Sequence, residues 1–253
     1  SDPVKALDMA YRHGRVMAME MLAVGIDVSF APVLDLDRGS RVIGNRSFSA
    51  DPEVVTLLGR SYLAGMRDAG MKATGKHFPG HGSVVADSHV DDVTDGRSLD
   101  DIRETDLRPF SELMPSLDAV MIAHVVYPRV DERPAGYSST WLQGVLRDEM
   151  NYRGVFLSDD LGMKAACVAG GVRERAEHCL AAGSDLVLVC QPGDTAELMA
   201  DPPGSVESAR EFQDRLYGRP TIDRSQIAEV RSEGIREWEY WRSSLERLGE
   251  SWS

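Results

Sequence analysis

The run Asp118-Ala-Val-Met-Ile-Ala-His-Val-Val126 decides the fold class of this chain. Its apolar residues stand at consecutive positions, not at alternate ones, and the run is too short for a typical helix. A strand that is apolar on both faces is buried on both, which is typical of a parallel sheet covered by helices. We therefore expect an interior strand here.

Helical and strand patterns alternate on both sides of this run. Four further strands are predicted, over Ile26–Asp35, Met71–Phe78, Gly154–Asp159 and Asp185–Cys190. Helical spacing of apolar residues predicts helices over Val4–Val24, Asp51–Asp68, Leu99–Leu113, Thr140–Met150 and Val172–Ala182, and a helical tail from about Thr195 with an apolar stripe at Trp238, Trp241 and Leu245. This alternation predicts an α/β fold with a parallel sheet.

Two architectures fit an alternating pattern: an open doubly wound sheet and a TIM-type (β/α)₈ barrel. No G-x-G-x-x-G and no G-x-x-x-x-G-K-[ST] motif occurs, so nucleotide-binding open sheets are disfavoured. Polar residues follow several strands, as in barrel enzymes: Asp35, Lys76, His77, His124 and Asp159. We favour one barrel domain over residues 1–253. Because a barrel needs about eight strands, either its first β/α units are missing or the sheet is not closed.

The composition narrows the possible partners. The 253 residues include 28 Lys+Arg and 41 Asp+Glu, so the net charge is −13. Such a charge argues against nucleic acid and against an anionic membrane surface as partners, and no apolar run approaches the length of a membrane span. The sparse, odd set Cys167, Cys179 and Cys190 favours a reducing compartment.

The densest group of chemically active residues is Lys76-His-Phe-Pro-Gly-His-Gly82, which precedes Asp87-Ser-His89. Gly and Pro indicate a loop, where side chains can converge on a pocket. An Asp beside a His fixes its tautomer and raises its basicity, so Asp87 and His89 are candidates for an acid/base pair. The alternative is that these polar side chains only satisfy loop backbone groups.

Two further segments carry candidate residues. In Ser158-Asp-Asp-Leu-Gly-Met163, strand alternation puts Asp159 on the face of Val155 and Leu157, so it would point into a pocket mouth and act as a nucleophile. Asp160 would cap the next helix. In Gly44-Asn-Arg-Ser-Phe48, Arg46 is a candidate for binding substrate hydroxyls or a carboxylate.

Taken together, the chain resembles the β-N-acetylglucosaminidases of glycoside hydrolase family 3. The segments that carry the resemblance are Ser29–Asp35, Gly44–Phe48, Gly75–Gly82, Asp87–His89, Ala123–Val125 and Phe156–Leu161. The Lys76–Gly82 run followed by Asp87–His89 is the most specific of them.

This resemblance implies a single (β/α)₈-type barrel in the cytoplasm that takes part in bacterial peptidoglycan recycling. The implied reaction is retaining hydrolysis of terminal β-linked N-acetylglucosamine from anhydromuramyl-peptide fragments, so the partner would be a small carbohydrate or muropeptide. Asp159 matches the nucleophile, His89 the acid/base and Asp87 the residue that tunes it. Lys76, His77 and Arg46 match sugar-binding residues, and no metal or organic cofactor is implied.

The chain departs from the family pattern in one respect. The Asp-Gln-Glu-Gly-Gly-Arg-type run of an earlier family strand is absent, so we expect an N-terminally shortened form. Three other readings stay open. One is a metal-dependent hydrolase using His77, His81, Asp87 and His89; the second is a phosphorylase of the same family, and the third is a sugar-binding module without turnover. A serine hydrolase using Ser88 is disfavoured because no G-x-S-x-G motif occurs.

Overall fold

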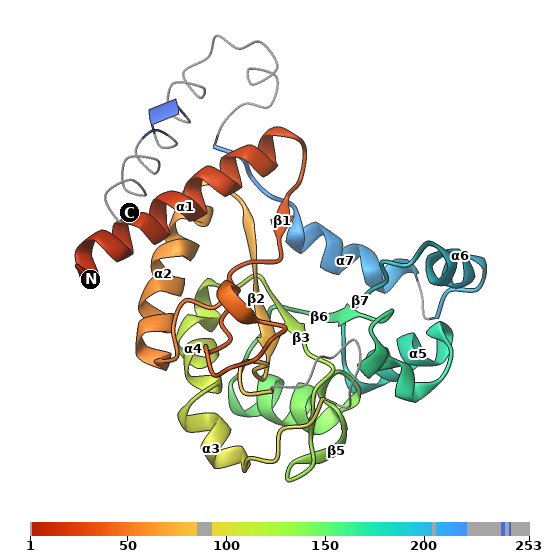
Figure 1. The fold of residues 1–253 in the computed structure, drawn as a ribbon. Helices are drawn as coiled ribbons and strands as arrows, with labels where there is room; N and C mark the ends of the chain where they lie inside the picture. The colour runs from red at the N-terminus through yellow and green to blue at the C-terminus, as the bar shows by residue number, and fades with distance from the viewer. Residues whose placement is uncertain (1, 85–92, 204–205, 222–238, 241–242, 244–253) are drawn as a thin grey trace.

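The computed structural model describes residues 2–84, 93–203, 206–221, 239–240 and 243. These residues build a curled parallel sheet with helices packed around it (Figure 1). The strand order is β1-β2-β3-β6-β7, and the bounds are β1 Val28–Ser29, β2 Lys72–Phe78, β3 Ala119–Ile122, β6 Val155–Asp160 and β7 Leu186–Leu188. The predicted parallel sheet is confirmed, and β3 is its fully buried central strand.

The described part of the sheet is TIM-barrel-like but is not a closed barrel. Its five strands run from β1 at one edge to β7 at the other, without a pairing between these two strands. The architecture is therefore a half-barrel, and the expected (β/α)₈ closure is not present within the described residues. Within this part of the chain, no helix is both long and apolar enough to cross a membrane.

The helices begin and end largely where their capping residues lie. Their bounds are α1 Pro3–Ala23, α2 Pro52–Ala69, α3 Leu99–Glu104, α4 Leu107–Leu113, α5 Val172–Ala182, α6 Pro192–Ala200 and α7 Val206–Leu216, with a π-helix η4 at Thr140–Glu149 and short 3₁₀ turns η1 Gly44–Arg46, η2 Met114–Ser116, η3 Ala135–Tyr137 and η5 Lys164–Ala169. The Asp51 side chain caps α2 by accepting from the Glu53 amide at 2.8 Å. Gly70 and Gly183 end α2 and α5 in the left-handed conformation that glycine adopts without strain.

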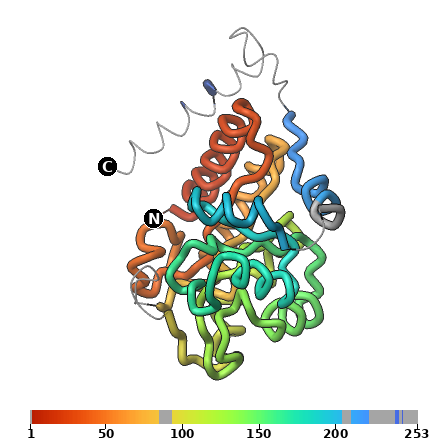
Figure 2. Tube along the Cα trace, turned by 90° about the vertical axis from the view of Figure 1, so that its right-hand side faces the viewer, coloured from red at the N-terminus to blue at the C-terminus, as the bar shows by residue number. Residues whose placement is uncertain are grey.

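Helices α1 and α2 lie side by side, as the turned view shows (Figure 2). Glycines allow this close packing, because a Cβ on Gly14 would lie 2.3 Å from the Tyr62 carbonyl oxygen and one on Gly65 would lie 2.1 Å from that of Tyr11. The main hydrophobic core lies between the sheet and the helices around it, and it includes Phe78 of β2 and Phe110 of α4, whose rings meet edge to face.

Four predicted elements differ from the structure. The predicted helix over Leu99–Leu113 is divided into α3 and α4, because Pro109 has no amide hydrogen to donate to the carbonyl of Thr105. The strand predicted over Ile26–Asp35 is regular only at β1. Beyond β1, the chain still follows β2: the Thr74 amide donates to the Ala31 carbonyl at 2.9 Å.

The third difference lies after β3. The predicted strand to Val126 ends at Ile122, and β4 (Val126–Tyr127) pairs antiparallel with β5 (Asp131–Pro134), a hairpin that the sequence analysis did not predict. The strand predicted over Asp185–Cys190 is β7, which is also shorter. The helical tail is confirmed in part by α6 and α7, and its predicted stripe at Trp238, Trp241 and Leu245 lies outside the described residues.

Candidate active site

Polar side chains from several strands meet at the carboxyl end of the sheet. Lys76 and His77 lie near the end of β2, His124 follows β3, and Asp159 lies near the end of β6. Asp35 joins them because the Leu34 amide donates to the Lys76 carbonyl at 2.8 Å, which holds the segment after β1 alongside β2. In α/β barrels this end of the sheet carries the chemistry.

Asp35 and His77 form a buried pair. Asp35 is 1% exposed, and its Oδ2 lies 2.6 Å from His77 Nδ1 and accepts from the His77 amide at 3.2 Å. Oδ1 accepts from the His81 amide at 2.7 Å. Burial by itself raises the pKa of Asp35, but attraction to His77 and His81 and their hydrogen bonds outweigh burial, so the pKa lies below its ordinary value. The ionised carboxylate can only accept, so His77 Nδ1 carries a proton and Nε2 faces the site.

Asp159 points toward His77 from β6. Its Oδ2 lies 4.0 Å from His77 Nε2, and its side chain is 16% exposed, so the carboxylate is reachable from the site and is not buried in the apolar core. Its Oδ1 accepts from the Asp160 amide at 2.8 Å. The carboxylate of Asp160 turns away and accepts from the amides of Gly162 and Cys190, both at 3.0 Å, so it holds the turn after β6 to the end of β7.

Two cations act at this end of the sheet: Lys76, which is attracted to Asp159, and Arg46, which acts on Lys76. Lys76 is partly buried, and burial lowers the pKa of its ammonium, while attraction to Asp159 opposes that shift. The Lys76 Nζ also lies 5.9 Å from the centre of the Phe30 ring, a cation–π distance. Arg46 repels Lys76 and so adds to the lowering of its pKa. The site therefore combines the Asp159 carboxylate, the cations Lys76 and Arg46, and the Nε2 atom of His77.

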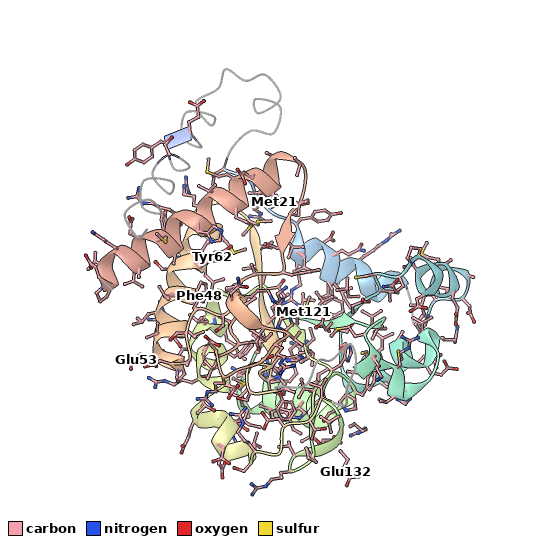
Figure 3. The ribbon with its side chains drawn as sticks, in the orientation of Figure 1. Met21, Phe48, Glu53, Tyr62, Met121 and Glu132 are labelled. Atoms are coloured by element: carbon pink, nitrogen blue, oxygen red, sulfur yellow. The ribbon has the colours of Figure 1, made fainter. Side chains whose placement is uncertain are left out.

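The loop of Arg46 is held by hydrogen bonds within itself and by a ring contact to α2. The Arg46 side chain is exposed and donates to the carbonyl oxygens of Val42 at 2.8 Å and Ile43 at 3.3 Å. Phe48, two residues further, contacts Tyr62 of α2 with ring centres 6.1 Å apart (Figure 3). Arg46 in this structure is bound to its own loop, and its guanidinium keeps further N–H groups for a ligand.

His124 contacts the backbone of Asp159. It is 3% exposed, and its Nε2 lies 3.2 Å from the Asp159 backbone carbonyl, to which it donates. Burial lowers the pKa of His124, so the ring is neutral near pH 7. Its Nδ1 has no hydrogen-bond partner among the described residues, and a Cβ on Gly136 would come within 3.0 Å of it. The sequence analysis placed His124 at a strand end but did not assign it this contact.

The candidate acid/base pair, Asp87 and His89, lies outside the described residues, and so does Ser88. The residues that flank this segment are described: Val84 and Val93 are both buried. The Val126 amide donates to the Val93 carbonyl at 2.9 Å, which joins the chain after the segment to β4.

A buried ion network that the sequence analysis missed supports the loop after β2. Arg97 donates to Asp95 and reaches Asp106 Oδ2 at 2.6 Å. Asp106 is 1% exposed and lies against Gly80, where a Cβ would meet the Asp106 Cβ at 2.6 Å. The Tyr127 hydroxyl donates to the Gly80 carbonyl. The loop that begins at Pro79 is therefore held by Asp106 and Tyr127.

The hypothesis of a metal-dependent hydrolase has no support among the described residues. In the part of the chain that the structure describes, no three His, Cys, Asp or Glu side chains lie close enough together to hold a metal ion. His77 and His81 are near each other, with ring centres 6.1 Å apart. The other two residues of the metal hypothesis, Asp87 and His89, lie outside the described residues.

Comparison with curated proteins finds close relatives with one name. The chain is 55% identical over 207 residues to the beta-hexosaminidase of Tolumonas auensis and 53% identical over 193 residues to that of Stenotrophomonas maltophilia strain K279a. These matches cover 79% and 76% of this chain. They cover 62% and 58% of the relatives, so the chain spans about three fifths of their length.

Solved structures agree with the sequence matches. NagZ from Neisseria gonorrhoeae in complex with N-trifluoroacetyl-D-glucosamine superposes with a TM-score of 0.83 at 41% identity, over 96% of this chain and 70% of that one. The same protein has also been solved in complex with a zinc ion, with a TM-score of 0.80. The sequence model of the glycosyl hydrolase family 3 N terminal domain matches residues 3–216. On its sequence and on its fold, this chain belongs to glycosyl hydrolase family 3.

Proposed function

We propose that this chain hydrolyses terminal β-linked N-acetylglucosamine with retention of configuration. The observation that carries the proposal is the position of Asp159: its side chain is partly exposed at the carboxyl end of the sheet, and its Oδ2 lies 4.0 Å from Nε2 of the buried His77. Support comes from the beta-hexosaminidase relatives and from the neighbour solved with N-trifluoroacetyl-D-glucosamine. The half-barrel would be part of a (β/α)₈ barrel, with residues 1–253 in one domain.

In this proposal Asp159 attacks the anomeric carbon, and a bond forms between its Oδ2 and that carbon as the bond to the leaving oxygen breaks. His89 gives its proton to the leaving oxygen, and Asp87 orients the ring. Water then attacks the glycosyl ester while His89 takes its proton, so Asp159 returns as a carboxylate. An imidazole with an ordinary pKa near ~6.5 suits both transfers near neutral pH.

The described contacts assign binding roles to other residues. His77, fixed through Nδ1 by Asp35, presents Nε2 to a sugar hydroxyl, and Lys76 and Arg46 present charged donors from β2 and η1. Charge-assisted bonds to hydroxyls in a partly buried site are stronger than in water. We propose GlcNAc-anhydromuramyl-peptides of peptidoglycan recycling, in the cytoplasm, as the natural setting.

The test uses 4-nitrophenyl β-N-acetylglucosaminide and the variants Asp159→Ala and Asp37→Asn. Asp37 is an exposed carboxylate near the site and is the matched control. We expect Asp159→Ala to lose about 10⁴-fold or more in kcat, as nucleophile variants do, and the control to keep the wild-type rate. Added azide should enter from the face that Asp159 leaves and give the α-azide. Equal rates in both variants would remove Asp159 as the nucleophile.

Two arms of the same assay separate the alternatives. Running it in phosphate and analysing the product by NMR distinguishes free N-acetylglucosamine from its 1-phosphate, since a neutral histidine acid/base does not repel a phosphate as a carboxylate would. Repeating it with a chelator tests the metal-dependent reading, which predicts loss of activity. His89→Ala should slow substrates with poor leaving groups more than the 4-nitrophenyl substrate.

A further inference from the structure

A large cavity lies at the opposite end of the sheet from Asp159. Its volume is about 1080 Å³. Lys72 at the start of β2, Asp118 before β3 and Gly154 before β6 line it, and α7 closes one side with Arg215. The Arg219 amide donates to the Gly70 carbonyl at 2.8 Å, which ties the chain after α7 to the start of β2. Strands of six or seven residues separate the two ends of the sheet by about 20 Å.

The charge of this cavity is opposite to that of the whole protein. Five basic side chains and two acidic ones line it, whereas the chain carries −13. Lys72 and Asp118 neutralise each other at 2.7 Å. The other basic residues are arginines, at positions 67, 153, 215 and 219.

These four arginines differ from most others in the described part of the chain. None of the four lies within 4.0 Å of a carboxylate there, whereas ten other described arginines do. Arg153 donates to Asn151 Oδ1 at 2.6 Å, and Arg215 donates to the Arg153 carbonyl. Each guanidinium has five N–H donors, so most of their donors remain available to a ligand.

Asp214 is the second acidic residue of the lining, so the four arginines outnumber the acid that remains after the Lys72–Asp118 pair and the cavity has a net positive charge. Like charges around one concavity repel each other, and an anion between them reduces that repulsion. Guanidinium groups bind phosphate and carboxylate oxygens alike in pairs of parallel hydrogen bonds. A diphosphate presents more oxygens and more negative charge than a dicarboxylate, so it can engage more of the four arginines at once. Apolar side chains, Met71 and Tyr152 among them, share the lining, so an apolar or planar group can be buried beside the phosphates. The volume is sufficient for a nucleotide.

We propose that this cavity binds a nucleoside diphosphate or a close analogue, with the phosphates on the arginines and the base against the apolar lining. The site is separate from the candidate active site and does not depend on the hydrolysis proposed above. A longer nucleic acid is disfavoured, because the rest of the surface is acidic and would repel it.

The test is isothermal titration of the whole chain with ADP, inorganic pyrophosphate and succinate at low salt. We expect saturable binding of ADP and of pyrophosphate, with ADP the tighter, and clearly weaker binding of succinate. Binding should weaken as salt is raised, because screening reduces the attraction. Absence of saturable ADP binding, or binding of succinate as tight as that of ADP, would overturn the proposal. Pyrophosphate binding as tight as that of ADP would show that the nucleoside base does not contact the cavity, which would overturn that part of the proposal.

Variants locate the ligand. Arg153→Gln and Arg219→Gln should each weaken ADP at least about tenfold, the loss expected for one charge-assisted contact. Arg60→Gln is the matched control, because Arg60 lies on α2 as Arg67 does but pairs with Glu112 outside the cavity. Equal losses in the control, or competition between ADP and N-acetylglucosamine, would place the anion elsewhere. Circular dichroism melting confirms that each variant is folded.

Discussion

Replacing Asp35 by Asn keeps the shape of the side chain and removes its charge, so it isolates what the carboxylate does for His77. Asp35 accepts three hydrogen bonds, two at Oδ2 and one at Oδ1. An amide has one accepting oxygen, so in either orientation its NH₂ group faces at least one buried N–H donor. A hydrogen bond to a charged group contributes about 1.5–3 kcal/mol, and an unsatisfied buried donor costs about 1–3 kcal/mol. We expect a loss of about 3 kcal/mol in the free energy of unfolding.

The same change should release His77. Loss of a preference of about 2 kcal/mol changes the ratio of the present orientation to others from about 30:1 to about 1:1, so the oriented fraction falls about twofold and we expect kcat/KM to fall by about that factor. Urea unfolding measures the stability, and turnover of the chromogenic N-acetylglucosaminide is measured where the variant is fully folded. Asp37→Asn, two residues away and exposed, is the control. If Asp35→Asn matches this control in both measurements, the pair does not orient His77.

Two further predictions follow from buried charges. Arg97→Met should destabilise the fold by about 3–5 kcal/mol in urea, because the buried Asp106 loses its closest cation. Arg133→Met removes an arginine that is mostly exposed and should cost less than about 1 kcal/mol. Equal costs would contradict the role of the network. Burial lowers the pKa values of His81 and His124, so below pH ~6.5 the unfolded chain binds more protons than the folded one and stability falls by up to about 1.4 kcal/mol per pH unit for each histidine. A stability profile that is flat between pH 7 and 5 would refute this, and a His124→Gln variant should have a shallower slope.

The order of helices and strands could be predicted from sequence because burial leaves a periodic pattern. The buried run at Asp118–Val126 and its alternation with helices were sufficient for a parallel sheet. The ends of elements depend on single residues, which periodicity does not register. Pro109 divides a helix through one missing amide hydrogen, and the pairing of β4 with β5 depends on contacts between short segments.

The candidate site was predictable where its residues follow strands. Asp159, Lys76 and His77 were named from their motifs, and the structure brings them to one end of the sheet. The pairing of His77 with Asp35 was not predicted. Asp35 lies 42 residues earlier in the sequence and reaches His77 only because the segment after β1 runs alongside β2. An acid at the end of one strand opposite a histidine near the end of the next was the signal available. The Arg97 network left only a weak signal: Asp95 and Arg97 lie two residues apart in one loop, but their partner Asp106, at the start of α4, meets Arg97 only once the chain is folded.

The hydrogen bond between the Asp160 amide and Asp159 Oδ1 has a consequence for inhibitor chemistry. The carboxylate cannot turn freely, so it offers one unencumbered oxygen toward the pocket. A compact ammonium group needs only one oxygen, so it could pair with the carboxylate through that oxygen alone. A flat guanidinium grips a carboxylate through both oxygens at once, and here it would have to contend with the Asp160 amide for the second. Compounds with a protonated ring nitrogen should therefore outperform guanidine-bearing ones of equal size.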